Sequence, residues 1–206
     1  MGQYYYPIIL EEKKQENDDE KIILWMCAHE YDNGLKLMEH SYILNDFVQT
    51  FEKLLTLRGG HYKSRVVWAG DYADKEPNVF YEYEGKQHEA NLYDLCDGKN
   101  TITPKSTTTK QYPFIINHTK KLFVDKRKVT TAGDNKGWEI HPLPLLTCEG
   151  NGRGGGDYHI PEDKPEYNDI IGSWARDVIS VEKTNPKENM STIDYKELLF
   201  NPQEKM

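Results

Sequence analysis

The residues best suited to chemistry gather in one glycine-rich segment, Gly150 to Asp157. It reads Gly-Asn-Gly-Arg-Gly-Gly-Gly-Asp, with five glycines in its first seven positions. Ordering glycine costs conformational entropy, so such a run indicates unusual φ angles or close approach to a ligand. Consecutive N–H groups can form an anion-binding nest, and an arginine adds a planar fork for phosphate. We predict a ligand site formed by Asn151, Arg153, Gly154, Gly155 and Asp157; the alternative is a long structural turn.

The segment formally contains the dinucleotide-binding pattern GxGxxG, through Gly150, Gly152 and Gly155. A nucleotide-binding helix should begin directly after that pattern. Pro161 and Pro165 stand there instead, so we do not expect a dinucleotide-binding fold.

Four residues outside this segment are further candidates for ligand binding. Asp71 follows a predicted strand and can accept from hydroxyl or amino groups, or cap a turn. Asp74 lies close by, but two carboxylates alone do not define a metal site, and we predict no metal. Trp174 can stack on a base while Arg176 holds a phosphate; the alternative is that Arg176 forms a surface ion pair with its neighbour Asp177 or braces the backbone. Tyr4 offers a second aromatic surface.

The sequence contains no recognised catalytic motif. The seven histidines are scattered, with neither HExxH nor HxH spacing, and no GxSxG motif is present. His141 and His159 bracket the glycine segment, but structural roles are favoured for both. The three cysteines form no CxxC pair, which favours a reducing cytoplasm. We expect no cofactor, and the residues favour a binding protein over an enzyme.

Charge and hydropathy narrow the class of partner. Charged residues make up 29% of the 206 residues, and the net charge is −8. An acidic chain lacks the basic footprint that long nucleic acids require. A local basic pocket within an acidic shell would still admit a small anion. No apolar run approaches the ~20 residues of a membrane span, and the N-terminus lacks a signal-peptide pattern. We therefore expect no membrane contact and a cytoplasmic location.

The pattern of strands and helices in the sequence predicts one α+β domain over residues 1–206, and this domain positions the candidate residues. Its mainly antiparallel sheet carries one principal helix, capped by Asn45 and ended by Gly59-Gly60. Residues 98–110 read as a flexible loop, and a polar tail begins near residue 186. The expected extended segments are 4–10, 22–29, 35–40, 65–69, 79–83, 114–117, 121–124, 143–148 and 178–181, the penultimate one as an edge strand because of its proline. Short helices are expected at 91–96 and 195–200.

Several motifs together resemble a protein family common in bacteriophage genomes and scattered through bacterial ones. They are the start Met-Gly-Gln-Tyr-Tyr, Gly34–Glu39, Ala69–Asp74 (AGDYAD), Asn91–Tyr93, Gly150–Asp157 (GNGRGGGD) and Ile171–Ala175, which includes Gly-Ser-Trp-Ala. The resemblance spans nearly the whole chain, but no activity is assigned to that family. The resemblance implies a small phage protein that acts against host defence in the cytoplasm of a bacterial host.

These observations lead to three hypotheses. The first is a protein that captures a small phosphate-bearing ligand and sequesters a nucleotide immune signal; a homodimer that builds the pocket between subunits stays open. The second is a hydrolase of a nucleotide or glycosidic bond, with Asp71, Asp74 and Asp157 as acid–base or metal-binding groups. The third is an interaction protein that inhibits a host enzyme.

Overall fold

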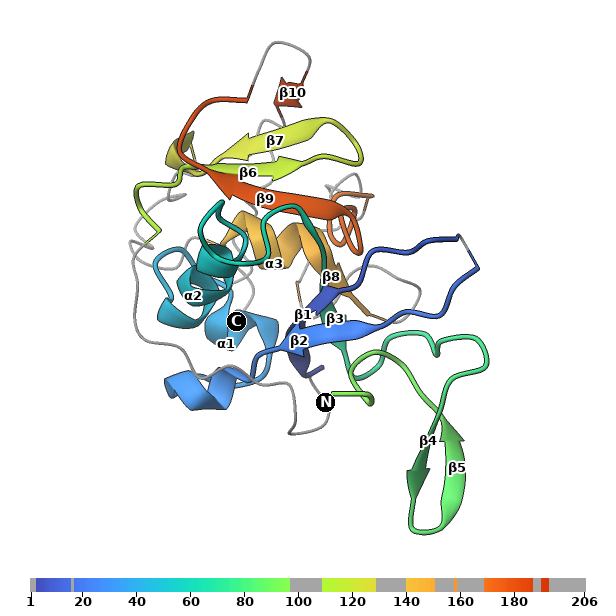
Figure 1. Cartoon of the computed structure of the whole chain (residues 1–206). Helices are drawn as coiled ribbons and strands as arrows, with labels where there is room; N and C mark the ends of the chain where they lie inside the picture. Colours follow the sequence, from blue (N-terminus) through green and yellow to red (C-terminus); the bar gives the residue numbers. More distant parts are fainter. Residues whose placement is uncertain are drawn as a thin grey trace.

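Strand β3 (Ser64–Gly70) organises the molecule, because other strands pair with both of its edges. The computed structural model describes residues 3–15, 17–96, 109–128, 140–150, 158, 169–186 and 190–192. Within these ranges one sheet has the strand order β10-β7-β6-β9-β3-β1-β2, with β8 also paired to β3 (Figure 1). The other strands are β1 (Tyr5–Leu10), β2 (Ile22–Trp25), β6 (Phe114–Asn117), β7 (Leu122–Asp125), β8 (Cys148–Glu149), β9 (Val178–Glu182) and β10 (Ser191–Thr192).

The pairing in this sheet is mostly antiparallel. Among the described strands, only β3 with β8 and β7 with β10 run parallel. On the edge of β3 opposite β1, strand β9 pairs with its first residues and β8 with its last. The α+β class with a mainly antiparallel sheet is therefore confirmed.

Side-chain alternation along β3 divides the interior into two hydrophobic clusters, as the two-residue period of a strand requires. Val66 and Trp68 point into the larger cluster, which the helices cover. Val67 and Ala69 point into the smaller cluster on the opposite face, together with Trp25. The sheet is thus buried on both faces at β3.

In the part of the chain that the structure describes, three α-helices lie beside the sheet (Figure 1): α1 (Leu37–His40), α2 (Asp46–Leu54) and α3 (Pro142–Thr147). Two 3₁₀ turns, η1 (Ala28–Tyr31) and η2 (Lys126–Lys128), accompany them. The predicted cap of the principal helix is confirmed, since the Asn45 side chain accepts from the N–H groups of Phe47 and Val48. None of the helices in the described ranges has the length and apolar character of a membrane span.

Two sequence predictions about secondary structure are wrong. The segment 143–148 is mainly helical, not an edge strand, because His141 caps it by accepting from the N–H of Leu143. Pro142 and Pro144 lie in the first turn, where a missing N–H removes no intrahelical hydrogen bond. Likewise, the expected extended stretch 35–40 contains α1.

A second, two-stranded sheet consists of β4 (Phe80–Tyr83) and β5 (Lys86–Glu89). This hairpin extends away from the main sheet in Figure 1, and most of its residues are exposed. The first strand was expected, whereas the second carries too little apolar alternation to be recognised. Most of the predicted loop at 98–110, the helix at 195–200 and most of the tail lie outside the described residues.

Candidate functional site

The carboxyl end of β3 and the residues that precede the glycine segment lie at one edge of the sheet. Trp68 pairs with Cys148 and Ala69 with Glu149 in parallel register. A Cβ atom on Gly70 would lie 2.6 Å from the carbonyl oxygen of Glu149, so glycine permits this close approach. The strands that lead into Asp71 and into the glycine segment, β3 and β8, therefore end side by side.

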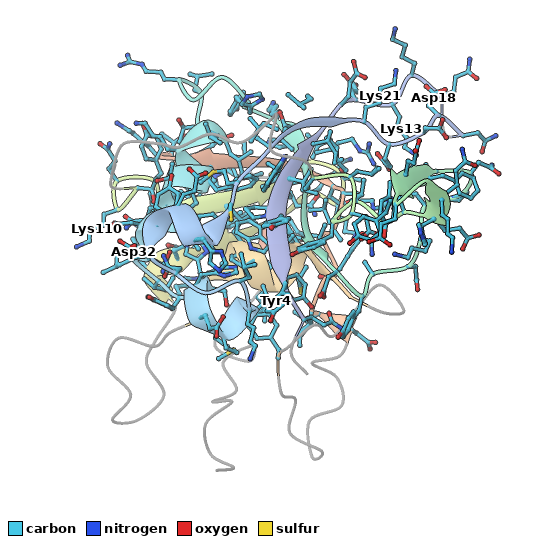
Figure 2. The ribbon with its side chains drawn as sticks, turned by 90° about the horizontal axis from the view of Figure 1, so that it is seen from below. Tyr4, Lys13, Asp18, Lys21, Asp32 and Lys110 are labelled. Carbon is cyan, nitrogen blue, oxygen red and sulfur yellow. The ribbon has the colours of Figure 1, made fainter. Side chains whose placement is uncertain are left out.

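Asp71 and Tyr4 lie together at this edge. The Tyr4 N–H donates to Asp71 Oδ1 at 3.0 Å, and the Asp71 N–H donates to the Tyr4 carbonyl, also at 3.0 Å. Asn91 donates to the carbonyl of Asp71. Tyr4 is 44% exposed and is labelled in Figure 2. Asp71 thus braces the start of β1, which accords with its expected alternative role in a turn.

The predicted ligand residues of the glycine segment lie outside the described residues. These are Asn151, Arg153, Gly154, Gly155 and Asp157. Their contact with a ligand stays a prediction.

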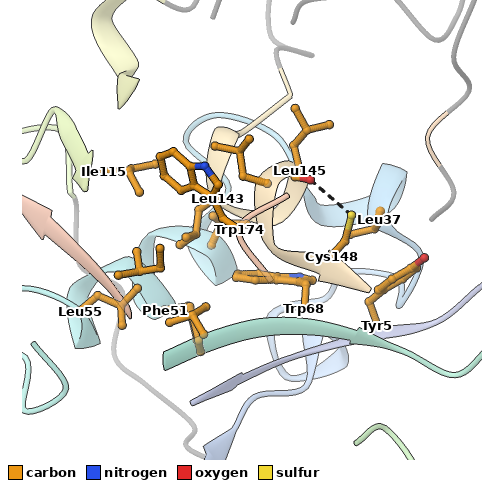
Figure 3. Packing of buried hydrophobic residues seen from close by; sticks show 14 of the residues in the cluster. Tyr5, Leu37, Phe51, Leu55, Trp68, Ile115, Leu143, Leu145, Cys148 and Trp174 are labelled. Carbon is orange, nitrogen blue, oxygen red and sulfur yellow. Dashed lines mark hydrogen bonds between the residues drawn. The ribbon is translucent and has the colours of Figure 1, made fainter. Parts of the chain in front are cut away.

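Trp174 belongs to the hydrophobic core. Its side chain lies in the larger cluster near Leu143 and Ile115, and the residue is 1% exposed (Figure 3). Its N–H donates to the carbonyl of Leu146. The expectation that this ring stacks on a base is corrected, because the core leaves no ring face for a ligand.

Arg176 is a buried junction between segments distant in sequence. Its Nε and Nη2 donate to the two carboxylate oxygens of Glu149 at 2.7 and 2.8 Å. Nη1 and Nη2 also donate to Glu76, and Nη1 lies 3.4 Å from Glu20. Burial alone would lower the pKa of Arg176, but the hydrogen bonds to Glu76 and Glu149 raise it. The expected phosphate-binding role is corrected, because this guanidinium is already saturated by carboxylates.

A groove of about 330 Å³ lies elsewhere, where the turn after α2 meets the end of β9. Its volume falls within the range of about 300–1,000 Å³ that is typical of small-molecule sites. It combines aromatic, cationic and acidic side chains. The lining residues are Leu57, Arg58, Tyr62, Tyr112, Val181, Glu182, Lys183 and Thr184. We call it the tyrosine groove.

The backbone of the turn after α2 fixes one wall of the tyrosine groove. The N–H of Gly59 donates to Thr56, and the N–H of His61 donates to Leu54. A Cβ on Gly59 would lie 1.9 Å from the carbonyl oxygen of Lys53, so only glycine fits there. The other wall is joined to the helix by a hydrogen bond from the Val181 N–H to the carbonyl of Leu55. Arg58 and Tyr62 therefore face β9 from a well-defined turn.

The tyrosine groove is strongly cationic. Lys53 and Lys183 place their ammonium groups 5.4 and 4.9 Å from the ring centre of Tyr112. Lys63 stands 5.3 Å from the ring centre of Tyr62. Neither these lysines nor Arg58 forms an ion pair with any carboxylate in the described part of the chain.

The positive charge of the groove contrasts with the charge of the chain. Four cations and the single carboxylate of Glu182 give this region a formal charge of +3, whereas the whole chain carries −8. Cations within a concave, partly apolar wall raise the local concentration of small anions. This is the local basic pocket within an acidic shell that the sequence left open.

A polar chain runs behind the groove to Glu182. The hydroxyls of Tyr62 and Ser180 each donate to Glu182 Oε1 at 2.8 Å. Because the Ser180 hydroxyl donates its only proton to Glu182, it acts as the acceptor for the Nε2–H of His118, 2.8 Å away. Ser180 itself has no exposed surface.

The protonation states of this chain follow from its surroundings. Burial, the hydrogen bond to Glu182 and the charge of that carboxylate raise the pKa of Tyr62 to about 12. Burial and the charge of Lys63 lower the pKa of His118, against the opposing influence of Glu182. At neutral pH Tyr62 is therefore a donor and His118 is uncharged.

A second polar cluster is buried around Glu52, beside a cavity of about 150 Å³. Glu52 accepts from Lys126, His141 Nε2 and the Thr109 hydroxyl. Burial alone would raise the pKa of Glu52, but Lys126 lowers it to about 2. Because the charged members are paired with one another, this cluster joins α2 to η2 and to the start of α3 and offers no free charge among the described residues.

The groove residues were missed by sequence reasoning. The stretch Leu-Arg-Gly-Gly-His-Tyr-Lys at 57–63 was interpreted only as the end of a helix, although it interleaves cations and aromatics. Tyr112 and Lys183 come from distant segments, and no local pattern connects them. Within the described residues, no group of three or more His, Cys, Asp or Glu side chains could hold a metal ion.

Comparison with known proteins adds no relative. No protein-family model matches the chain, and no curated protein and no solved structure matches it either. The resemblance to the phage family stays a prediction.

Proposed function

We propose that the protein binds a small phosphate-bearing ligand, of the size of a nucleotide, in the tyrosine groove. The observation that carries this proposal is a set of four cations around two tyrosines, none of them paired with a carboxylate of the described residues. The phosphate of a nucleotide matches the cations, and its base matches the tyrosines. Its molecular size matches the volume of the groove. The proposal keeps the ligand class expected from the sequence and moves its site.

Arg58 and Lys183 are the phosphate ligands in this proposal, since both line the groove. A guanidinium matches the geometry of phosphate through paired N–H groups, and an ammonium adds a point charge. Hydrogen bonds to charged groups typically contribute about 1.5–3 kcal/mol each. Lys63 and Lys53 add attraction at longer range without direct contact.

Tyr62 provides the surface for an aromatic ring. Leu57, 76% exposed, extends the apolar wall beside it. Stacking of a base on an aromatic side chain contributes about 1–3 kcal/mol. Tyr112 is 9% exposed and lies beneath two lysines, so it forms the floor rather than the stacking surface.

The arrangement supports capture more than turnover. Ser180 is the hydroxyl nearest to a histidine here, but it is buried and engaged on both sides. A nucleophile must be exposed to substrate and activated by a base. The groove offers complementarity to a ground-state ligand, which binds without accelerating a reaction.

Capture of this kind fits the biological role implied by the resemblance to a phage family. A protein that holds a cyclic or ADP-ribose-type nucleotide in the bacterial cytoplasm withdraws that signal from host defence. We include sequestration of a nucleotide immune signal, an anti-defence function, in the proposal.

Isothermal titration tests the site and its ligand class together. Mononucleotides and cyclic dinucleotides are titrated, with and without magnesium, into the wild type and into Arg58→Ala and Lys183→Ala. Each substitution should weaken binding about tenfold or more. Lys21→Ala is the matched control, because Lys21 is an exposed cation on the β1–β2 loop (Figure 2), and its ion pair with Glu11 is likewise exposed.

The outcomes separate the hypotheses. Equal affinity for the wild type and Arg58→Ala would contradict the groove as the phosphate site. Recovery of the ligand as product in the chromatography of the titrated mixture would favour the hydrolase hypothesis.

A further inference from the structure

We propose that Glu182 makes the tyrosine groove selective for ligands whose aromatic ring carries an exocyclic amino group. This inference rests on the proposed function and names the class of base within it. It would make Glu182 a specificity-determining residue for adenine-type rings.

The first step concerns how the two oxygens of the Glu182 carboxylate are used. The hydrogen bonds of Tyr62 and Ser180 both fall on Oε1. Among the described residues, none donates to Oε2. The Glu182 side chain is 23% exposed and lines the groove. A carboxylate is an acceptor only, so this oxygen calls for a donor from the ligand or from water.

The second step concerns where the ligand phosphate can lie. Glu182 is the one carboxylate in a lining that also contains Arg58 and Lys183. A phosphate beside the Glu182 carboxylate would meet like charge, so it is directed toward the cations Arg58 and Lys183. The ligand therefore has its phosphate at Arg58 and Lys183 and a neutral donor at Glu182.

The third step places a ring edge at that donor position. The hydroxyl at the far end of the Tyr62 ring is itself bonded to Glu182. A planar ring stacked along Tyr62 therefore ends within reach of the same carboxylate. Amino groups stand on the edges of nucleobases, whereas the ribose hydroxyls lie between base and phosphate. This geometry favours an amino donor over a ribose hydroxyl.

The polar chain keeps the acceptor in place. Ser180, backed by His118, and Tyr62 hold Oε1 from two directions. A site built to bond a donor discriminates against an analogue that lacks it, because its polar group is then left unpaired. Partial exposure of Glu182 to water reduces that discrimination, so we expect about tenfold or more.

A matched pair of ligands tests this inference. Adenosine 5′-monophosphate and purine riboside 5′-monophosphate differ only in the amino group. The wild type should bind the amino compound about tenfold or more tightly. In Glu182→Gln the amide oxygen can take over the bonds of Tyr62 and Ser180, so its NH₂ faces the ligand. The preference should then disappear, and inosine 5′-monophosphate, with a carbonyl oxygen at that position, should gain.

The outcomes separate this inference from the proposed function. Equal binding of the two purine nucleotides, with binding still lost in Arg58→Ala, overturns the selectivity alone. The selectivity is also overturned if 2′-deoxyadenosine 5′-monophosphate binds more weakly while purine riboside 5′-monophosphate does not. Glu182 would then bind the ribose and not the amino group. If no mononucleotide or dinucleotide binds, the proposed function fails and the selectivity falls with it.

Discussion

Replacing Arg176 by alanine should destabilise the protein strongly. The substitution leaves Glu76 and Glu149, 7% and 2% exposed, without their main counter-charge, while Arg65 still pairs with Glu20. Removing one partner of a buried ion pair costs about 3–5 kcal/mol. For a chain of this length, each kcal/mol lowers Tm by about 2–4 °C, so the expected decrease is about 6–20 °C. Because alanine at the φ of 67° is as restricted as arginine, backbone strain does not account for the change.

The assay is thermal and urea unfolding of the wild type, Arg176→Ala and the control Lys21→Ala, at several pH values. The control removes an exposed cation and should leave Tm unchanged. In Arg176→Ala the two glutamates stay buried and lose the positive charge of Arg176. Protonation of a buried carboxylate removes the cost of burying its charge, so the variant should approach the wild type as the pH falls toward 5. A decrease below about 3 °C, or a difference that grows on acidification, would refute the reasoning.

Three further predictions concern single residues. Gly59→Ala should destabilise the protein by about 1–3 kcal/mol, since the new Cβ would lie 1.9 Å from a backbone oxygen; an unchanged urea midpoint would contradict this. The depressed pKa of Glu52 stabilises the fold above its ordinary pKa of 4.5, and this contribution is lost as the pH falls toward about 2. The stability of Glu52→Gln should therefore decline less than that of the wild type between pH 4.5 and about 2. Parallel curves of unfolding free energy against pH would contradict this. In ultraviolet titration one tyrosine should ionise near pH 12, and Tyr62→Phe should remove that step; its persistence would assign it to another tyrosine.

Much of the fold is predictable from local patterns. The apolar strands, the Asn45 cap and the hairpin at 114–124 all follow from periodicity and turn chemistry. The prediction failed at α3, where the decisive fact is that Pro142 and Pro144 fall in the first turn. The sequence predicts a helix start before these prolines only if His141 is recognised as its N-cap.

The site was less predictable, for a physical reason. Arg176 reads locally as a free cation, yet it pairs with glutamates 27 and 100 positions away in the chain. Trp174 likewise looks like a stacking surface until the core around it is known. The tyrosine groove joins Tyr62, Tyr112 and Glu182, which only the sheet and α2 bring together.

Photoaffinity labelling tests the location of the ligand most directly. The protein is irradiated with 8-azidoadenosine 5′-monophosphate, digested, and mapped by mass spectrometry, with unlabelled nucleotide as competitor. The account predicts competed labelling in the peptides that contain Tyr62 and Lys183. Labelling confined to the peptide that contains Arg153 would contradict the groove and return the site to the glycine-rich segment.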